Sequence, residues 1–95
     1  MASLEIAYYC KAPNQNMPGD GISAETIATL SATNQRSGAT PAHADYVKIS
    51  ANGGAARYSY TSATSTASAT TPWIGSGEAI WLPAHAGWKV GGITG

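Results

Sequence analysis

The side chains best able to do acid–base or metal chemistry are two histidines, His43 and His85, each flanked by alanines. Together with Cys10 or Asp45 they supply ligand types that zinc prefers. None of these residues falls at a recognised ligand spacing such as C-x-x-C or H-x-x-x-H. We therefore expect solvated histidines, and neither a metal site nor a cofactor.

Nucleophilic and carboxylate chemistry has equally little support. Ser76 lies between two glycines, but the nucleophile elbow requires G-x-S-x-G between a strand and a helix, and here the flanking residues indicate a turn. Cys10 precedes Lys11, yet no partner base can be placed beside it. The five carboxylates are scattered along the chain, so glycosidase-like chemistry is unsupported: Glu5, Asp20, Glu25, Asp45 and Glu78. A small hydrolase using His43 or His85 ranks last, and we predict that the protein is not an enzyme.

Aromatic side chains are the one enriched functional type. The chain has three Trp and five Tyr but no Phe. These residues can form a stacking platform for a sugar or a single-stranded nucleic acid, or they can fill the core and a protein interface. The second interpretation is favoured because something large must replace Phe in the core. Nucleic acid is the least favoured ligand, since only five residues are basic.

Composition places the chain among small, single-domain proteins. It has 95 residues, a formal net charge of zero and 11% charged residues, which leaves no electrostatic footprint for nucleic acid or an anionic membrane. Its single cysteine cannot form an intramolecular disulfide. No signal-peptide pattern and no apolar run of about 20 residues is present. We expect a soluble protein made in the cytoplasm.

Alternation of apolar and polar residues predicts an all-β fold, a small antiparallel sandwich or barrel. In the strand that begins at Tyr46, the residues Val47, Ile49 and Ala51 should share one face. Asn52-Gly53-Gly54 should close a hairpin to the next strand. The four segments that alternate are 45–50, 56–60, 78–83 and 88–93.

The remaining segments are less regular. Residues 4–9 suit a first strand or an extended N-terminal arm, and the many turn formers in 11–21 predict a long loop. Residues 22–31 fit either a capped helix or a strand, and the β-branched residues favour the strand. The Ser/Thr/Ala tract 61–71 is predicted to be an ordered loop rather than an interdomain linker. We thus divide one domain into an N-terminal strand or arm with a Pro/Gly-rich loop, 1–21, and a β-sandwich, 22–95.

The stretch from about residue 22 to residue 93 resembles small structural proteins of tailed-bacteriophage virions. The resemblance implies a β-sandwich that decorates or cements the capsid or belongs to another part of the virion, and it carries no catalytic motif. The chain departs from the pattern because it lacks an Asp-Gly turn after the aromatic strand and has a long N-terminal segment. The segments that carry the resemblance are Tyr46-Val47-Lys48-Ile49-Ser50, Gly53-Gly54, Arg57-Tyr58-Ser59-Tyr60, Ala67-Ser68-Ala69-Thr70, Glu78-Ala79-Ile80-Trp81-Leu82-Pro83 and Gly87-Trp88-Lys89-Val90-Gly91-Gly92-Ile93.

These observations lead to two function hypotheses. The first is a non-enzymatic, homo-oligomeric virion protein that binds the major capsid protein or other virion proteins on the capsid exterior. Residues 1–21 would act as an arm, adding a strand to a neighbour's sheet edge. The candidate interface residues of this first hypothesis are Leu4, Ile6, Tyr8, Tyr9 and Trp73. The alternative is a carbohydrate-binding or host-attachment module of a tail, fibre or collar, with Trp73, Trp81 or Trp88 as the stacking platform.

Overall fold

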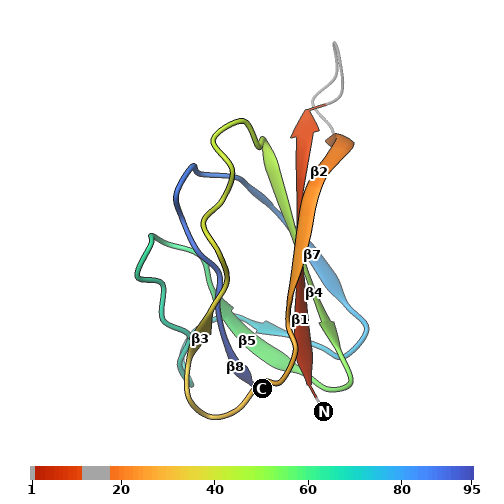
Figure 1. Cartoon of the computed structure of the whole chain (residues 1–95). Coiled ribbons are helices and arrows are strands. Elements are labelled where there is room, and N and C mark those ends of the chain that lie inside the picture. Colours follow the sequence, from red (N-terminus) through yellow and green to blue (C-terminus); the bar gives the residue numbers. More distant parts are fainter. Residues whose placement is uncertain (1, 12–17) are drawn as a thin grey trace.

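The computed structural model describes residues 2–11 and 18–95 and is all-β in this part of the chain (Figure 1). No helix long and apolar enough to cross a membrane occurs among these residues. Segment 22–31 belongs to a strand as far as Ile27, in agreement with the favoured prediction. The strands are β1 (Ser3–Lys11), β2 (Pro18–Ile27), β3 (Gln35–Arg36), β4 (Tyr46–Asn52), β5 (Ala56–Ser59), β6 (Trp73–Ile74), β7 (Ala79–Pro83) and β8 (Gly91–Thr94).

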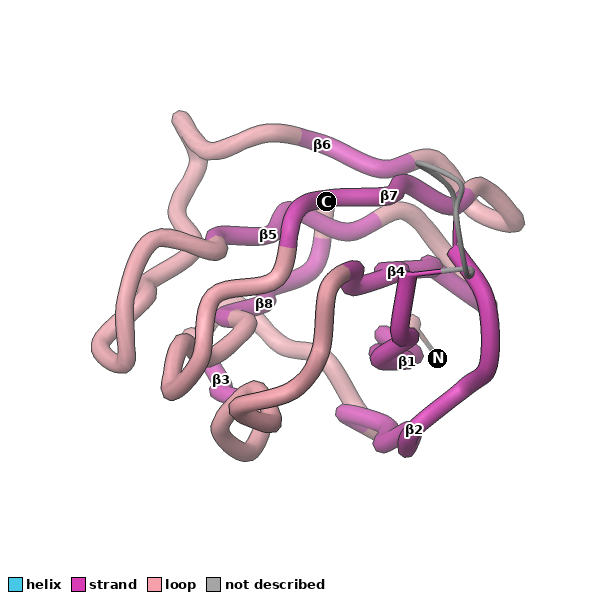
Figure 2. The backbone as a smooth tube through the Cα atoms, turned by 90° about the horizontal axis from the view of Figure 1, so that it is seen from above, coloured by secondary structure: helices cyan, strands magenta, loops and turns pink. Residues whose placement is uncertain are grey.

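The strands form two antiparallel sheets of four strands each, which confirms the predicted β-sandwich. Sheet A has the order β2-β1-β4-β7, and sheet B has the order β3-β8-β5-β6. Seen from above, β2, β1 and β4 of sheet A face β3, β8 and β5 of sheet B (Figure 2). The arrangement leaves β2 and β7 as the edges of sheet A.

The core lies between the sheets and is built by strict alternation. Strand β1 turns Leu4, Ile6 and Tyr8 inward, each at most 1% exposed. Strand β4 contributes its alternate residues in the same way, and the predicted inward face of that strand is confirmed. The remaining buried core residues come from the end of β2, from sheet B and from the loops: Ile27, Ala56, Ile74, Leu30 and Val90.

Two adjacent glycines in β8 leave room for close neighbours on the two faces of sheet B, Gly92 toward sheet A and Gly91 toward the 61–71 tract. A Cβ on Gly92 would lie 2.5 Å from Leu4 Cδ1, and a Cβ on Gly91 would lie 2.6 Å from the Ser65 carbonyl oxygen. Strand β8 begins at Gly91, so the predicted strand over 88–93 starts three residues too early. At these glycines other segments of the same chain approach the β8 backbone closely, as expected for glycine within a strand.

The hairpin predicted at Asn52-Gly53-Gly54 is wrong. Strand β4 pairs with β1 and β7, whereas β5 pairs with β6 and β8. The turn, with φ of 71° at Gly53 and 155° at Gly54, thus carries the chain from one sheet to the other. Positive φ identifies a sharp change of direction, but it does not determine which strands pair afterwards.

The N-terminal segment is an integral part of the sandwich. Strand β1 pairs with β2 along one side and with β4 along the other, so it lies inside sheet A. Strand β2 begins at Pro18, within the stretch predicted to be an irregular loop, and the pairing shifts register between Tyr8 and Tyr9. The rest of that predicted loop, 12–17, lies outside the described residues.

The Ser/Thr/Ala tract 61–71 is held by side-chain hydrogen bonds, in agreement with the prediction of an ordered loop. The hydroxyl of Ser65 is buried and accepts the backbone N–H groups of Thr61 and Ser62. The Arg36 guanidinium donates to the carbonyl oxygens of Thr64 and Ser65. The tract therefore covers the outside of sheet B at Gly91.

Replacing Gly92 by Ala should destabilise the fold by about 1–3 kcal/mol, because the new methyl group overpacks the space occupied by Leu4. Equilibrium denaturation measures this penalty. The same substitution in a Leu4→Val background, which lacks the clashing Cδ1 atom, should cost distinctly less. Equal penalties in the two backgrounds would show that the Leu4–Gly92 contact does not limit the spacing of the sheets.

Candidate functional site

The residues singled out for chemistry are dispersed by the fold. His43 and His85 are exposed in separate loops, and Cys10 is half-buried in β1. Among the described residues, no group of three or more His, Cys, Asp or Glu side chains could hold a metal ion. Asp45 instead accepts the backbone N–H of Lys11 at 2.7 Å.

His85 belongs to an aromatic cluster at one end of the sandwich. Its ring stacks on Trp88 with centroids 4.0 Å apart, and Tyr60 packs edge-on against Trp88 at 5.2 Å. The Tyr60 hydroxyl accepts the backbone N–H of His85 at 2.8 Å and bonds the Thr40 hydroxyl at 2.9 Å. These contacts join the loop after β7 to Tyr60 at the end of β5 and to Thr40 in the loop between β3 and β4, which is a structural role.

The outward face of sheet A carries a second group of aromatic side chains. Cross-strand pairing places Ala24, Ala7, Lys48 and Trp81 in one row across the four strands. The pleat turns all four to the side opposite the core, because directly paired residues share a face. We call this surface the sheet-A face; its other members are Tyr9, Tyr46 and Pro83 in one adjacent row and Thr26, Glu5, Ser50 and Ala79 in the other.

Two aromatic rings stand on the sheet-A face. Tyr9 and Trp81 reach over β4 toward each other, with ring centroids 4.9 Å apart at a tilt of 54°. The Lys48 ammonium lies 5.6 Å from the centre of the Trp81 ring, within cation–π distance. Trp81 nevertheless remains 45% exposed. A pre-ordered yet exposed indole of this kind is typical of a contact surface.

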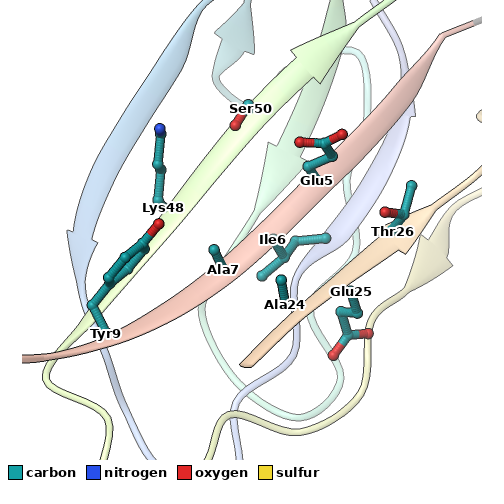
Figure 3. Close-up of a pocket in the computed structure, with 9 residues that line it drawn as sticks. All are labelled: Glu5, Ile6, Ala7, Tyr9, Ala24, Glu25, Thr26, Lys48 and Ser50. Atoms are coloured by element: carbon teal, nitrogen blue, oxygen red, sulfur yellow. The ribbon is translucent and has the colours of Figure 1, made fainter. Parts of the chain in front are cut away.

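A hollow lies beside this aromatic pair (Figure 3). Ala7 and Ala24 are paired neighbours, and their short side chains leave a depression between larger ones. Tyr9 and Lys48 stand on one side of the hollow, and Glu5 and Thr26 stand on the other. The site thus combines an apolar floor with one basic group, the two carboxylates of Glu5 and Glu25, and several hydroxyl groups.

The structure separates the sequence-predicted interface residues into two groups. Leu4, Ile6 and Tyr8 are core residues, so a partner could reach them only if β1 left the sandwich. Tyr9 lies on the sheet-A face, and Trp73 is 55% exposed on the outside of sheet B, next to Arg57 in the pairing of β6 with β5. The interface prediction therefore needs correction for the three inward residues.

Trp81 was not among the predicted interface residues, although the sequence contains the signal. In Ala79–Pro83 the apolar side chains Ile80 and Leu82 alternate with Trp81, so Trp81 lies on the face opposite to theirs. The half-buried Ile80 and Leu82 pack against the core. Alternation across this strand identifies an outward tryptophan once its inward neighbours are assigned.

Tyr8 carries a buried hydroxyl that has no hydrogen-bond partner among the described residues. The neighbouring hydroxyls are engaged elsewhere: Ser37 accepts the Val90 N–H, and Thr40 donates to the Trp88 carbonyl. Burial raises the pKa of the Tyr8 hydroxyl above its usual value, and the proximity of Ser37 only partly opposes this increase. An unpartnered buried hydroxyl destabilises the fold.

Comparison with protein-family models, with curated proteins and with solved structures found no match to the chain.

Replacing Tyr8 by Phe should leave stability unchanged or raise it by about 1 kcal/mol, because the substitution removes an unsatisfied polar group. The matched control is Tyr60→Phe, which removes a hydroxyl with two good partners and should cost about 1 kcal/mol. Chemical denaturation compares the two variants. If Tyr8→Phe lost as much stability as Tyr60→Phe, the Tyr8 hydroxyl would have to be hydrogen-bonded, contrary to its description as unpartnered.

Tyr8→Phe and the unmodified protein together test the raised pKa of Tyr8. When the pKa of a phenol is raised by folding, the unfolded chain loses its proton first, so stability falls as pH rises above about 10. Tyr8→Phe should lose less stability between about pH 9 and 11 than the unmodified protein. Part of the decline should remain, because burial also raises the pKa of Tyr58. Parallel pH profiles for the two proteins would refute the assignment.

Proposed function

We propose that the protein is a non-enzymatic structural subunit of a bacteriophage virion that decorates the outside of the capsid and stabilises it. The observation that carries the proposal is the presence of two exposed tryptophans on opposite sheets, Trp81 on sheet A and Trp73 on sheet B. A subunit that cements a lattice needs at least two separate contact surfaces. The resemblance to small virion proteins gives the biological setting.

Charge and size also suit this role. With a net charge of zero, neighbouring copies do not repel one another strongly. Exposed aromatic rings supply contact energy that depends little on salt. Each surface is small, but several weak contacts engaged at once give a tight attachment. In this account the contacts are made by the outer faces of the folded sandwich, and no N-terminal arm is required.

A second candidate function is saccharide binding, the favoured alternative for a tail, fibre or collar protein. The hollow beside Tyr9 supports it, because an aromatic ring next to carboxylate, ammonium and hydroxyl groups fits the mixed surface of a sugar. Titration of the protein with a panel of mono- and oligosaccharides, followed by tryptophan fluorescence, tests this function. Absence of any response at millimolar sugar would remove it.

Purified virus particles provide the direct test of the first function. The protein should be present in them in hundreds of copies, as measured by quantitative mass spectrometry against the major capsid protein. A few or a dozen copies would place it at a vertex or in the tail instead. Its absence from particles that are otherwise complete would contradict a virion role.

The sheet-B surface can be tested by substitution. Trp73→Ala should weaken binding to capsids that lack the protein at least tenfold, as expected when a central interface aromatic is removed. The domain should stay folded, because Trp73 is mostly exposed. Ala42→Leu, a change at an exposed turn, is the control and should bind normally. Unaltered capsid binding by Trp73→Ala would exclude this surface as the capsid contact.

A further inference from the structure

We infer that the Ser/Thr/Ala tract 61–71 is a strap, a segment that closes over the outer face of sheet B and opens from it as one unit while the sandwich stays folded. The inference does not depend on the proposed function. Its basis is a repeated turn, a pair of equivalent arginine contacts and an apolar patch that lies outside the main core.

The strap contains one turn built twice. Ser62-Ala63-Thr64-Ser65 and Ser68-Ala69-Thr70-Thr71 follow each other at a spacing of six residues. In both turns the N–H of the last residue donates to the carbonyl oxygen of the first, at 3.3 Å and 3.2 Å. In both, the hydroxyl of the last residue accepts the N–H of the first at 3.0 Å and donates to its carbonyl oxygen, at 2.8 Å and 2.9 Å. Because each turn is closed by its own side chains, it can keep its shape when it leaves the sheet.

Each turn is fastened to sheet B by an arginine at the same position of the turn. The carbonyl oxygen of Ser65, the last residue of the first turn, accepts the Arg36 Nε–H at 2.8 Å. The carbonyl oxygen of Thr71, the last residue of the second turn, accepts an Arg57 Nη1–H at 2.8 Å. Arg36 belongs to β3 and Arg57 to β5, the two strands that flank β8. The strap is therefore attached on both sides of β8.

A small apolar patch lies beneath the strap. Ala67 and Ile93 are buried, but neither belongs to the main cluster between the sheets. Ile93 pairs with Arg57, and Arg57 pairs with the exposed Trp73, so these three side chains lie on the outer face of sheet B. The strap (teal in Figure 1) lies on this side and crosses β8 within contact distance of Gly91. It thus covers Ile93 with Ala67, as a long loop covers a satellite cluster.

The attachment of the strap is weak enough to open separately. Among the described residues, the strap takes part in no strand pairing, and seven of its eleven residues are exposed. Few buried apolar contacts and many exposed hydrogen bonds are typical of a segment that opens before the strands do. Ala67 lies between the two turns, so release of either turn uncovers the patch that seats the other. We therefore expect both turns to open together and to bare Ile93 beside Trp73.

Two backbone amides measure this opening because each bonds across the boundary between strap and sandwich. The Lys89 N–H donates to the Ser62 carbonyl oxygen in the first turn at 3.1 Å, and the Ala67 N–H donates to Asn34 Oδ1 at 2.8 Å. In hydrogen–deuterium exchange of the full chain, resolved by NMR, both amides should exchange with one common protection factor. That factor should be lower than the factors of residues 47–51 in β4.

Substitution of one arginine tests whether the strap is a single unit. Arg57→Gln removes the bond to the second turn, yet it should accelerate exchange of both the Lys89 and the Ala67 amide by about tenfold, since a hydrogen bond to a charged group is lost. Arg36→Gln should have the same effect from the first turn. Ser76→Ala, at an exposed position outside the strap, is the control and should change neither amide. The β4 amides should keep their protection in all three variants.

Three results would overturn the inference. An unchanged Lys89 amide in Arg57→Gln would show that the two turns open independently. Protection of the Lys89 and Ala67 amides equal to that of β4 in the unmodified protein would show that the tract does not open separately. Equal acceleration of the β4 amides in the arginine variants would show that strap and sandwich unfold together. All measurements use the free protein, so their outcome is independent of the virion role.

Discussion

The position of β1 between β2 and β4 is the constraint on which the rest of the structure depends. Through Leu4, Ile6 and Tyr8 this strand supplies the largest buried side chains of sheet A. Leu4 also reaches the backbone of Gly92 in sheet B, so it helps to determine how closely the sheets approach. A chain that lost β1 would lose the centre of one sheet and much of the core.

The position of β1 also determines which side chains lie on the sheet-A face. Because side chains alternate along a strand, burying Leu4, Ile6 and Tyr8 turns Ala7 and Tyr9 outward. The pairing of β1 with β4, and of β4 with β7, then brings Tyr9 within ring distance of Trp81. Core and contact face are thus two consequences of one alternation, which is why the face remains ordered although it is exposed.

The sequence predicted which face of a strand is buried, but it did not predict which strands pair with one another. Alternation correctly assigned Val47, Ile49 and Ala51 to the core, because this pattern depends only on neighbouring residues. Asn52-Gly53-Gly54 correctly indicated a turn but not the change of sheet, since strand pairing depends on contacts far apart in the chain. For residues 4–9 the sequence left a first strand and an extended arm open, and the structure has the strand, β1. Its central place in the sheet could not be predicted, because an edge strand and a central strand share the same local pattern. The pairing of Ala7 with Ala24, and hence the hollow, could not be foreseen before the register was known.

The central claim is that β1 is a core strand, so the contacts that we propose with other molecules use the outer faces of the intact sandwich. Hydrogen–deuterium exchange of the isolated protein tests this most directly, because amides in central strands open only with much of the fold. We predict that the amides of Leu4 to Tyr8 exchange as slowly as those of Val47 to Ala51 in β4. Rapid exchange throughout β1, with β4 still protected, would show an N-terminal segment that detaches from the sandwich and would contradict the account.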